Sequence, residues 1–377
     1  MQHDAAPFGC GHCAAARHDA PCYKSDMDGR ARRQLRLWAI LVGAGAGAGL
    51  VYMPFLSETV TAGQALRFAA QGAIIAALVF GFEIFIAQGP ASEPLRRAPF
   101  AVVFLVKTLI TTALIVTAYG IGGLVLFPGR FAEGRPFLDL ARDTGYALAV
   151  SLVLQFVLMV QAIVGGRVLF NLILGRYHRP LGEERVFMFL DVRGSTALAE
   201  RLGGVGAYAM ISRFFFDVAQ ETARYGGETH EYIGDAVVVT WPLERAVEDA
   251  RCLQCYFAIC DRIELKAQLY EREFGLVPGF RVGLHGGPIV AGECGDDRRQ
   301  IVYFGDTINT AARIQEACKE VGRPLLVSGE LLRRMKLPPI YAATSLGRAR
   351  LRGREKEIEL FTVQREAADR RRGHRGR

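Results

Sequence analysis

The segment ETHEYIGDAVVVTW, Glu228–Trp241, has the pattern of two short strands joined by a tight turn. The first strand ends at Ile233, the chain turns at Gly234 and Asp235, and an apolar run follows. Gly-Asp is common turn chemistry, so an aspartate here is ordinary when taken alone. A second acidic residue, Glu231, lies four residues before Asp235 and makes the hairpin unusual.

The residues around the hairpin alternate between strand and helix patterns. An apolar run before the hairpin indicates a buried strand, and apolar residues at helical spacing indicate amphipathic helices. The succession β-α-α-β-β-α-β predicts an α+β sandwich of ferredoxin-like type. The predicted strands are 185–191, the two halves of 228–241, two strands around Gly286 and Gly287, 300–306, 324–327, 342–347 and 357–363, and the predicted helices are 195–203, 205–224, 243–271 and 307–320.

The N-terminal half is apolar enough to enter a membrane. The chain has 377 residues and is 51% hydrophobic, yet its net charge is +8. A membrane-spanning helix needs roughly 20 apolar residues, which predicts an all-α domain of four transmembrane helices. Lys and Arg in the short connections place the N-terminus and the C-terminal half in the cytoplasm, as in a multi-pass protein of the inner or plasma membrane. The four stretches are Leu37–Phe55, Phe68–Ala87, Phe100–Phe127 and Tyr146–Val164.

Charges inside and outside these spans have more than one interpretation. Glu83 and Lys107 fall within spans, where they either pair with each other or reach the interface separately. Arginine clusters at both ends of the chain form solvated tails or attract anionic lipid. Nucleic acid is not an expected partner, because no aromatic residues are interleaved with the tail arginines. An N-terminal group either binds zinc or belongs to a disordered tail without metal: Cys10, Cys13, His18 and Cys22.

The patterns divide the chain into five segments. Tails flank a membrane part, a helical linker that leaves the last span, and the α+β domain. The segments are a cytoplasmic N-terminal tail 1–34, a transmembrane domain 35–166, a linker 167–183, the α+β domain 184–363 and a basic tail 364–377.

Two aspartates close separate predicted strands. Asp191 ends the first strand and Asp235 lies at the tip of the hairpin. These strands are expected to be neighbours in the middle of a ferredoxin-like sheet, so both carboxylates would project from one edge. Carboxylate oxygens on rigid elements are what two hard divalent ions require. Gly194 and Ser195 lead into a helix N-terminus, which can donate backbone N–H groups to a phosphate.

Four motifs in this order resemble those of class III nucleotide cyclases, which make cyclic AMP or cyclic GMP. The motifs are FLDVRGSTALAERLG, YIGDAVVV, RVGLHGGPIVAGECG and YFGDTINTAARI. The resemblance covers 184–363 and implies that this segment is the catalytic domain. It also implies a head-to-tail homodimer in which each site takes its metal-binding aspartates from one chain and its Asn and Arg from the other.

The resemblance assigns roles to individual residues. It implies two divalent metal ions, Mg²⁺ or Mn²⁺, at Asp191 and Asp235, with Val192 beside them. It implies that Asn309 and Arg313, which share a helix face at a spacing of i and i+4, stabilise the transition state. The nucleotide-binding set is Gly194, Ser195, Thr196, Glu231, Val302 and Arg354, with Lys356 as an alternative to Arg354.

The substrate base is read by a pair of positions that departs from both family patterns. Members that use ATP normally carry Lys at the position of Glu231, and Asp or Thr at that of Val302. Glu231 suits the donors of guanine, whereas Val302 offers guanine nothing. We expect ATP to be converted to 3′,5′-cyclic AMP and pyrophosphate in intracellular signal transduction. GTP and cyclic GMP remain the alternative, and Glu231 could also be a solvated strand residue that reads no base.

Three other functions agree less well with the sequence. A catalytically weak cyclase-like regulatory domain on a membrane sensor is disfavoured, because Asp191, Asp235, Asn309 and Arg313 are all present. A diguanylate cyclase shares the ferredoxin-like core but requires a different hairpin signature. A transporter is disfavoured because four spans without a discontinuous helix pair offer little substrate path.

Overall fold

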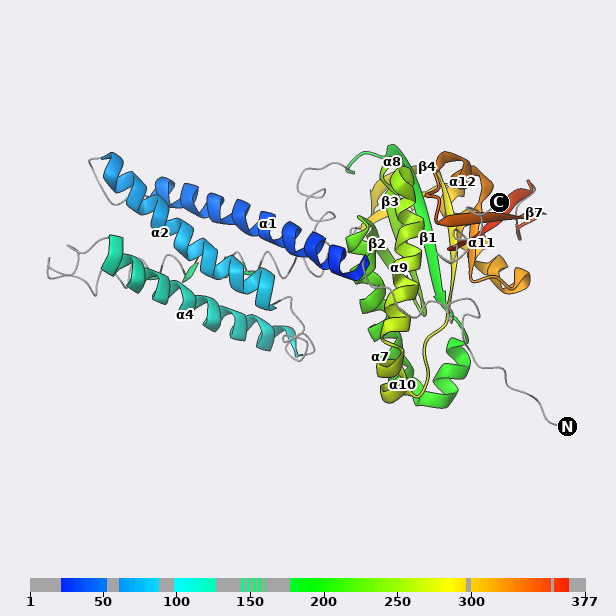
Figure 1. Ribbon diagram of the computed structural model, residues 1–377, viewed down its shortest axis with the longest axis horizontal. Coiled ribbons are helices and arrows are strands. Elements are labelled where there is room, and N and C mark those ends of the chain that lie inside the picture. The colour runs from blue at the N-terminus through cyan, green and yellow to red at the C-terminus, as the bar shows by residue number, and fades with distance from the viewer. Residues whose placement is uncertain are drawn as a thin grey trace, which may run out of the picture. The chain divides into compact units, whose positions relative to one another are not determined.

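The computed structural model describes residues 22–52, 61–87, 98–126, scattered positions between 144 and 160, and then 177–295, 300–353 and 356–365 (Figure 1). Contacts within the chain divide it into one unit spanning Ala20–Phe170 and another that contains Asn171–Arg377. This division lies within the linker that the sequence predicts at 167–183.

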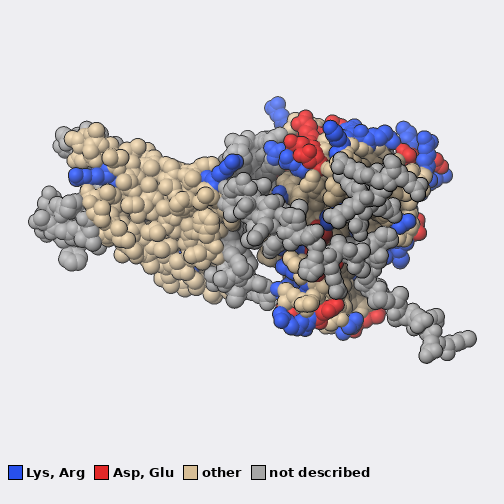
Figure 2. Space-filling model, in the orientation of Figure 1, with Lys and Arg blue, Asp and Glu red and all other residues tan. Residues whose placement is uncertain are grey.

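The first unit consists of long apolar helices. They are α1 (Cys22–Tyr52), α2 (Ala62–Gly81), which continues as the π-helix η2 (Phe82–Ala87), and α4 (Phe100–Leu126). Three described segments are long and apolar enough to cross a membrane: Gln34–Val51, Ala62–Ala87 and Ala101–Gly122. The face of these helices that Figure 2 shows carries few charged side chains, and these lie toward the two ends. They correspond to the first three predicted spans, whereas the fourth, Tyr146–Val164, lies mostly outside the described residues.

Small residues allow α1 and α2 to approach closely. A Cβ added to Gly72 would lie 2.2 Å from the Gly45 carbonyl oxygen, and one added to Gly49 would lie 2.1 Å from that of Phe68. Such backbone contact through small residues is typical of helix packing in membranes.

Several polar side chains inside this unit pair with one another, although the buried Gln71 Oε1 accepts no hydrogen bond from the described residues. Lys107 Nζ lies 2.6 Å from Glu83 Oε1, which confirms the pairing interpretation of these two charges. Gln155 donates to the Lys107 carbonyl oxygen at 3.2 Å, and Thr108 donates to Gln155 Oε1 at 3.1 Å. Polar side chains inside a lipid bilayer are usually paired in this way.

The second unit is built on one eight-stranded sheet, which confirms the predicted α+β ferredoxin-like class. The order is β2-β3-β1-β4-β6-β8-β7, and β5 pairs with β4 beside this path. β1 lies between β3 and β4 and is antiparallel to both, while β4 and β6 are parallel. The strands are β1 (Leu181–Val192), β2 (Glu228–Ile233), β3 (Ala236–Pro242), β4 (Phe280–Cys294), β5 (Gln300–Phe304), β6 (Leu325–Ser328), β7 (Tyr341–Ala349) and β8 (Ile358–Arg365).

Helices cover the two faces of the sheet unequally. Most of them pack on one face, as α9 does in front of β1 and β3 in Figure 1. α11 packs on the other face, where it lies against β4 and β6. The helices are α7 (Ser195–Arg224), α8 (Leu243–Val247), the 3-10 turn η5 (Glu248–Ala250), α9 (Arg251–Leu265), α10 (Ala267–Phe274), α11 (Asp306–Val321) and α12 (Gly329–Arg334).

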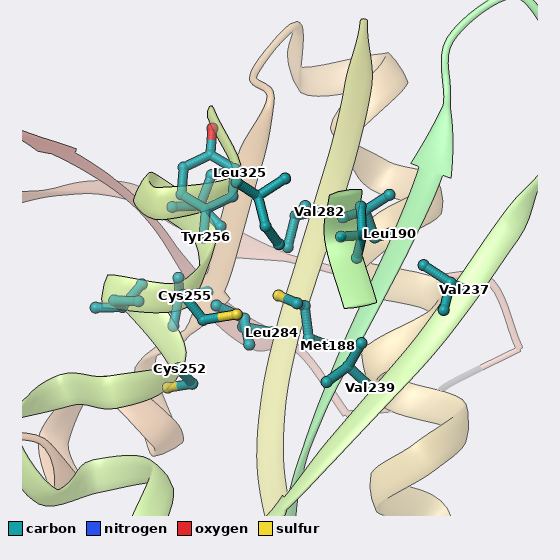
Figure 3. Packing of buried hydrophobic residues seen from close by; sticks show 14 of the residues in the cluster. Met188, Leu190, Val237, Val239, Cys252, Cys255, Tyr256, Val282, Leu284 and Leu325 are labelled. Carbon is teal, nitrogen blue, oxygen red and sulfur yellow. The ribbon is translucent and has the colours of Figure 1, made fainter. Parts of the chain in front are cut away.

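The alternation of side chains along β1 separates the core from the second face. Successive strand residues point to opposite sides, and the even-numbered ones enter the main core against α7 and α9. Figure 3 shows this packing, with Met188 pointing toward Cys255 of α9 and Leu190 beside Val282 of β4. Cys252 and Cys255 of α9 are therefore core residues. We call the opposite side the site face, defined by the odd-numbered residues Arg185, Phe187, Phe189 and Asp191.

Three sequence predictions differ from the observed elements. The helix predicted at 243–271 is broken, because Asp249 and Ala250 have φ of 52° and 53°. The two helices predicted at 195–203 and 205–224 form one element kinked at Gly203, where φ is 71°. The two strands predicted around Gly286 and Gly287 are one continuous strand, β4.

A buried carboxylate between α7 and α10 should contribute strongly to stability. Asp217 is fully buried, receives a hydrogen bond from the Tyr270 hydroxyl at 2.9 Å and lies 2.5 Å from Lys266 Nζ. We expect Asp217→Ala to lower the free energy of unfolding by about 3 kcal/mol, because it leaves buried partners unsatisfied. Chemical denaturation measures this. The exposed pair of Asp261 with Arg365 is the control, and Asp261→Asn should cost less than about 1 kcal/mol.

Candidate active site

The hairpin brings the two aspartates to one edge of the sheet. The chain reverses at Gly234, whose φ is 62°, and Ile233 pairs with Ala236. Asp191 pairs with Ala236, and the Val192 N–H donates to the Asp235 carbonyl oxygen at 3.2 Å. The predicted metal-binding residues Asp191, Val192 and Asp235 therefore lie together at the junction of β1 with the hairpin.

The electrostatics of this junction suit a cation. Burial, and next the charge of Asp235, raise the pKa of Asp191 to about 6, against the opposing effects of a hydrogen bond from Gln315 and the charge of Arg281. Two like charges at close range are unfavourable without a counter-ion, so the pair fits a hard divalent ion such as Mg²⁺ or Mn²⁺. Within the described residues no group of three or more His, Cys, Asp or Glu could hold a metal. Phosphate and water oxygens would have to complete the coordination.

The raised pKa predicts a pH-dependent penalty on folding. The pKa of Asp191 rises from 3.8 to about 6, so its ionised form destabilises the folded chain above pH 6, and this penalty fades as the pH falls toward 3.8. Without divalent metal, Asp191→Asn should melt at a higher temperature than wild type at pH about 7.5, and the difference should shrink toward pH about 5. Fluorescence of the buried Trp241 follows this unfolding. An unchanged difference at both pH values would contradict the electrostatic assignment.

The N-terminus of α7 follows directly after the first aspartate. Gly194 has φ of 66° and precedes Ser195, the first residue of the 30-residue helix, so glycine rather than Ser195 occupies the N-cap position. Ser195 is partly buried and Thr196 is exposed. N–H groups in a first helical turn have no partner within the helix and can bind a phosphate. The predicted nucleotide-binding residues Gly194, Ser195 and Thr196 are thus next to the carboxylate pair.

α11 presents Asn309 and Arg313 away from its own chain's aspartates. Both are exposed, and Arg313 forms a forked pair with Glu316 at 3.0 and 2.8 Å. Gln315 lies on another side of the helix, where it hydrogen-bonds Asp191. At 100° per residue, Gln315 is rotated by about 200° from Arg313 and by about 240° from Asn309. One chain therefore does not bring all four predicted catalytic and metal-binding side chains together.

The two predicted base-reading positions lie on β2 and β5. Glu231 is exposed on β2, and Val302 is partly buried on β5, where it pairs with Gly292. β2 and β5 do not pair, but side chains next to both positions are in contact. The ring of His230, beside Glu231, lies 4.7 Å from the ring of Tyr303, beside Val302. Arg354 lies outside the described residues, and its alternative Lys356 is exposed.

The sequence motifs assign no role to Gln315, Arg185 or Tyr303, although Tyr303 lies within the motif YFGDTINTAARI. Gln315 reaches Asp191 because Gly283 has no side chain: a Cβ there would lie 2.3 Å from the Gln315 backbone nitrogen. Arg185 is a charged residue within an apolar strand and Tyr303 is a ring in another strand. The arginine in an otherwise buried run is a signal that the sequence contains, whereas the partner of Gln315 depends on how α11 lies on the sheet.

Comparison with known proteins decides the family. Residues 182–365 match the adenylate and guanylate cyclase catalytic domain family. The chain is also 36% identical over 321 residues to adenylate cyclase 2 of Rhizobium meliloti strain 1021, covering 84% of this chain and 87% of that relative. The chain belongs to the class III nucleotidyl cyclases. Another similar protein is adenylate cyclase 1 of the same strain, 28% identical over 186 residues that cover 48% of this chain and 27% of the relative.

A solved structure supports the fold of this cyclase. A bacterial light-regulated adenylyl cyclase aligns with a TM-score of 0.50 at 19% identity, covering 62% of this chain and 67% of that one. The similarity to adenylate cyclase 2 extends beyond the catalytic domain, since it covers 84% of a chain in which that domain is about half. The cyclase thus shares both its enzymatic domain and most of its N-terminal part with that relative.

Proposed function

We propose that this cyclase converts ATP to 3′,5′-cyclic AMP and pyrophosphate, with two divalent ions, Mg²⁺ or Mn²⁺, at Asp191 and Asp235. The observation that carries the proposal is the carboxylate pair beside the N-terminus of α7, where the charge of Asp235 helps to raise the pKa of Asp191. Cation ligands and phosphate-binding N–H groups are therefore adjacent, as a nucleoside triphosphate requires. The relative with 36% identity is named an adenylate cyclase.

The residues of the chain perform binding, alignment and charge neutralisation. Divalent ions, when bound, supply acidification of the ribose 3′-hydroxyl and neutralise phosphate charge. Backbone N–H groups at Ser195 and Thr196 bind phosphate oxygens. The ribose 3′-oxygen releases its proton to water and attacks the α-phosphorus, the bond from that phosphorus to the bridging oxygen breaks, and pyrophosphate leaves. Arg313 neutralises charge that grows on the α-phosphoryl group, and Asn309 holds the ribose, so that positioning and electrostatics lower the barrier.

The site is completed by a second copy of the chain. Asn309 and Arg313 are exposed, and Gln315, on another side of α11, contacts the aspartate of its own chain. A homodimer in which α11 of one chain faces the carboxylate pair of the other brings the four side chains together twice. The pair of Arg313 with Glu316 is exposed, and such pairs are worth about 1 kcal/mol or less, so a phosphate can displace Glu316.

The choice of purine rests on Glu231 and Val302. Neither residue matches the ATP pattern, and Glu231 is an acceptor that suits guanine, so GTP is the second candidate substrate. ATP is favoured by the name of the relative that is similar over most of the chain. Val302 gives guanine O6 no donor, and an unpaired buried polar group costs about 1–3 kcal/mol.

The three apolar helices support an integral membrane location. They are long enough to span a bilayer. With the predicted stretch Tyr146–Val164 as a fourth span, both ends lie in the cytoplasm, where nucleotide is available. In this arrangement 35–166 is the membrane domain, 167–183 the linker and 184–363 the catalytic domain, between the tails 1–34 and 364–377.

The substrate test uses the full chain in membranes. We expect ATP with Mg²⁺ or Mn²⁺ to give cyclic AMP and an equal amount of pyrophosphate, and GTP to give less cyclic product at the same concentration. Mass spectrometry identifies the products. Predominance of cyclic GMP would replace ATP by GTP. Absence of both cyclic products would contradict the enzymatic proposal and favour a regulatory role for the domain.

A further inference from the structure

Arg185 is a buried charge at the centre of the site face. Its side chain is 4% exposed although it lies in an apolar strand. Nε donates to Thr240 Oγ1 at 3.1 Å, one terminal nitrogen donates to Glu183 at 3.1 Å, and the other donates to Glu228 at 3.2 Å. A buried arginine is tolerated only when its donors are satisfied, and this one uses its fork on two carboxylates.

The same guanidinium joins strands that do not pair with each other. Its carbon lies 4.9 Å from the centre of the Tyr303 ring on β5, while Glu228 belongs to β2 at the other side of β1. Tyr303 also contacts Phe187 of β1, with ring centres 5.6 Å apart, and His230 of β2, at 4.7 Å. β2 and β5 are thus connected across the site face, and these are the strands that carry Glu231 and Val302.

A β-bulge explains why this connection matters to Glu231. Glu228 pairs with Thr240 and Thr229 with Val239, so regular pairing would place Glu231 opposite Val237, on the side of the main core. The register shifts between Thr229 and Glu231, and Glu231 pairs with Val238 instead. Glu231 is thereby turned to the side of Thr240 and Arg185. Bulges re-aim side chains in this way next to active sites.

The residues held in the cluster flank that bulge on both sides. Glu228, which Arg185 binds, precedes it, and His230, whose ring contacts Tyr303, lies inside it. Burial lowers the pKa of His230, the charge of Glu231 opposes this, and the positive charge of Arg185 lowers the pKa further. The ring of His230 is therefore favoured in its neutral form, which can pack against Tyr303 without another charge beside Arg185.

The cluster also reaches Tyr177, a residue of the predicted linker 167–183. Tyr177 is 5% exposed, its hydroxyl donates to Glu183 Oε1 at 3.0 Å, and its carbonyl oxygen accepts the N–H of Glu293 in β4 at 3.0 Å. Glu183 therefore contacts Tyr177 with one oxygen and Arg185 with the other. A displacement of Tyr177 would disturb the carboxylate that orients Arg185.

We propose that Arg185 is a positioning residue for purine recognition, which holds the β2 bulge and β5 in register and which Tyr177 connects to the linker. The inference rests on the proposed function, because it takes Glu231 and Val302 as the residues next to the base. Arg185 itself does not touch the nucleotide. Its loss changes the aim of Glu231, so the binding and the choice of purine change more than the chemical step.

The test compares three substitutions in the full chain with one control. Arg185→Lys keeps the charge but not the fork, Glu228→Gln weakens one arm, and Tyr177→Phe removes one hydroxyl and leaves the ring. The control is Arg334→Lys, since Arg334 binds Glu184, the neighbour of Arg185 on β1, at an exposed pair of 2.7 Å. KM and kcat are measured for ATP and GTP. The Kd is measured with Mn²⁺ and a 3′-O-labelled fluorescent ATP analogue that lacks the attacking hydroxyl.

We expect a change in KM rather than in kcat. Arg185→Lys should raise the KM for ATP and the Kd of the analogue about tenfold and change the ratio of ATP to GTP use, because charged hydrogen bonds are lost. Tyr177→Phe should raise both by about threefold. The double variant Tyr177→Phe/Glu228→Gln should raise the KM for ATP by less than the product of the two single increases. This is expected for residues of one network. Arg334→Lys should behave as wild type.

The outcomes separate this inference from the proposed function. If wild type makes no cyclic product, the proposed function fails, while the Kd of the analogue still reports on the cluster. If wild type is active but the three variants match the control in KM, Kd and purine ratio, the positioning role is wrong and the enzyme assignment stands. A loss of kcat alone, or equal losses in the control, would also overturn it.

Discussion

Asp235→Asn should abolish cyclic nucleotide synthesis while leaving the protein folded. The substitution keeps the size of the side chain and the hairpin turn, but it removes one of the two charges that face a metal ion. We expect kcat to fall about a thousandfold or more, at least as much as for loss of one preorganised stabilising group in other enzymes. The measurement is the rate of product formation at saturating ATP and metal.

Asp249→Asn provides the matched control for Asp235→Asn. Asp249 is exposed in the turn η5, far along the chain from both metal-binding positions, and its φ of 52° is one that asparagine also adopts. Its activity and melting temperature should match those of wild type. Near-normal activity of Asp235→Asn at saturating Mg²⁺ and Mn²⁺ would show that the carboxylate pair is not the metal site.

Mixing two inactive variants should restore activity. Asp191→Ala lacks a metal ligand but retains Arg313, whereas Arg313→Ala lacks the guanidinium but retains both aspartates. If each site takes aspartates from one chain and Arg313 from the other, a heterodimer has one intact site. Random pairing should therefore recover about a quarter of wild-type activity, because half of the dimers are mixed and each has one good site of two. Co-expression and assay of the whole mixture measure this, and the heterodimers isolated through two affinity tags should have about half of wild-type activity.

The control for complementation is a pair of variants on the same side of the site. Asp191→Ala mixed with Asp235→Ala leaves one aspartate missing from every site, so no recovery is expected. Recovery in this control would show that the two aspartates of one site do not come from the same chain. An absence of recovery in the first mixture, with heterodimers demonstrated, would mean that Arg313 acts within its own chain.

The features that local pattern determines were predicted from the sequence. The hairpin around Asp235 and the strand ending near Asp191 follow from short apolar runs bounded by turn residues, and their adjacency follows from the ferredoxin-like order. The broken helix was missed because Asp249 and Ala250 are neither glycine nor proline. Ala250 is fully buried in the main core, so tertiary packing determines the break there.

The prediction of two strands in place of β4 was wrong because glycine residues there do not mark a turn. Gly286 and Gly287 suggested a turn, yet they lie within β4, where a Cβ on Gly287 would be 2.9 Å from Thr307 Oγ1 and one on Gly286 would be 2.9 Å from a Val186 methyl group. Glycine is needed there for close approach rather than for reversal of the chain. Local sequence does not distinguish the two uses.

The supporting residues of the candidate site depend on contacts between distant segments. The hydrogen bond of Gln315 to Asp191 requires α11 to lie directly on Gly283. The orientation of Glu231 requires a bulge that periodicity alone does not reveal, because a single extra residue inverts which side of the strand faces the core. The sequence therefore indicated the aspartates and the base-reading positions, whereas the side chains that support them emerged from the fold.

Electron paramagnetic resonance of bound Mn²⁺ tests the central claim most directly. In the presence of the 3′-O-labelled ATP analogue, the carboxylate pair and the phosphates should bind two Mn²⁺ ions per site at about 3.5–4 Å, which gives a spin-coupled spectrum. Asp235→Asn should eliminate the coupled signal. A spectrum of single uncoupled ions, or a coupled spectrum unaffected by Asp235→Asn, would contradict a two-metal site at Asp191 and Asp235.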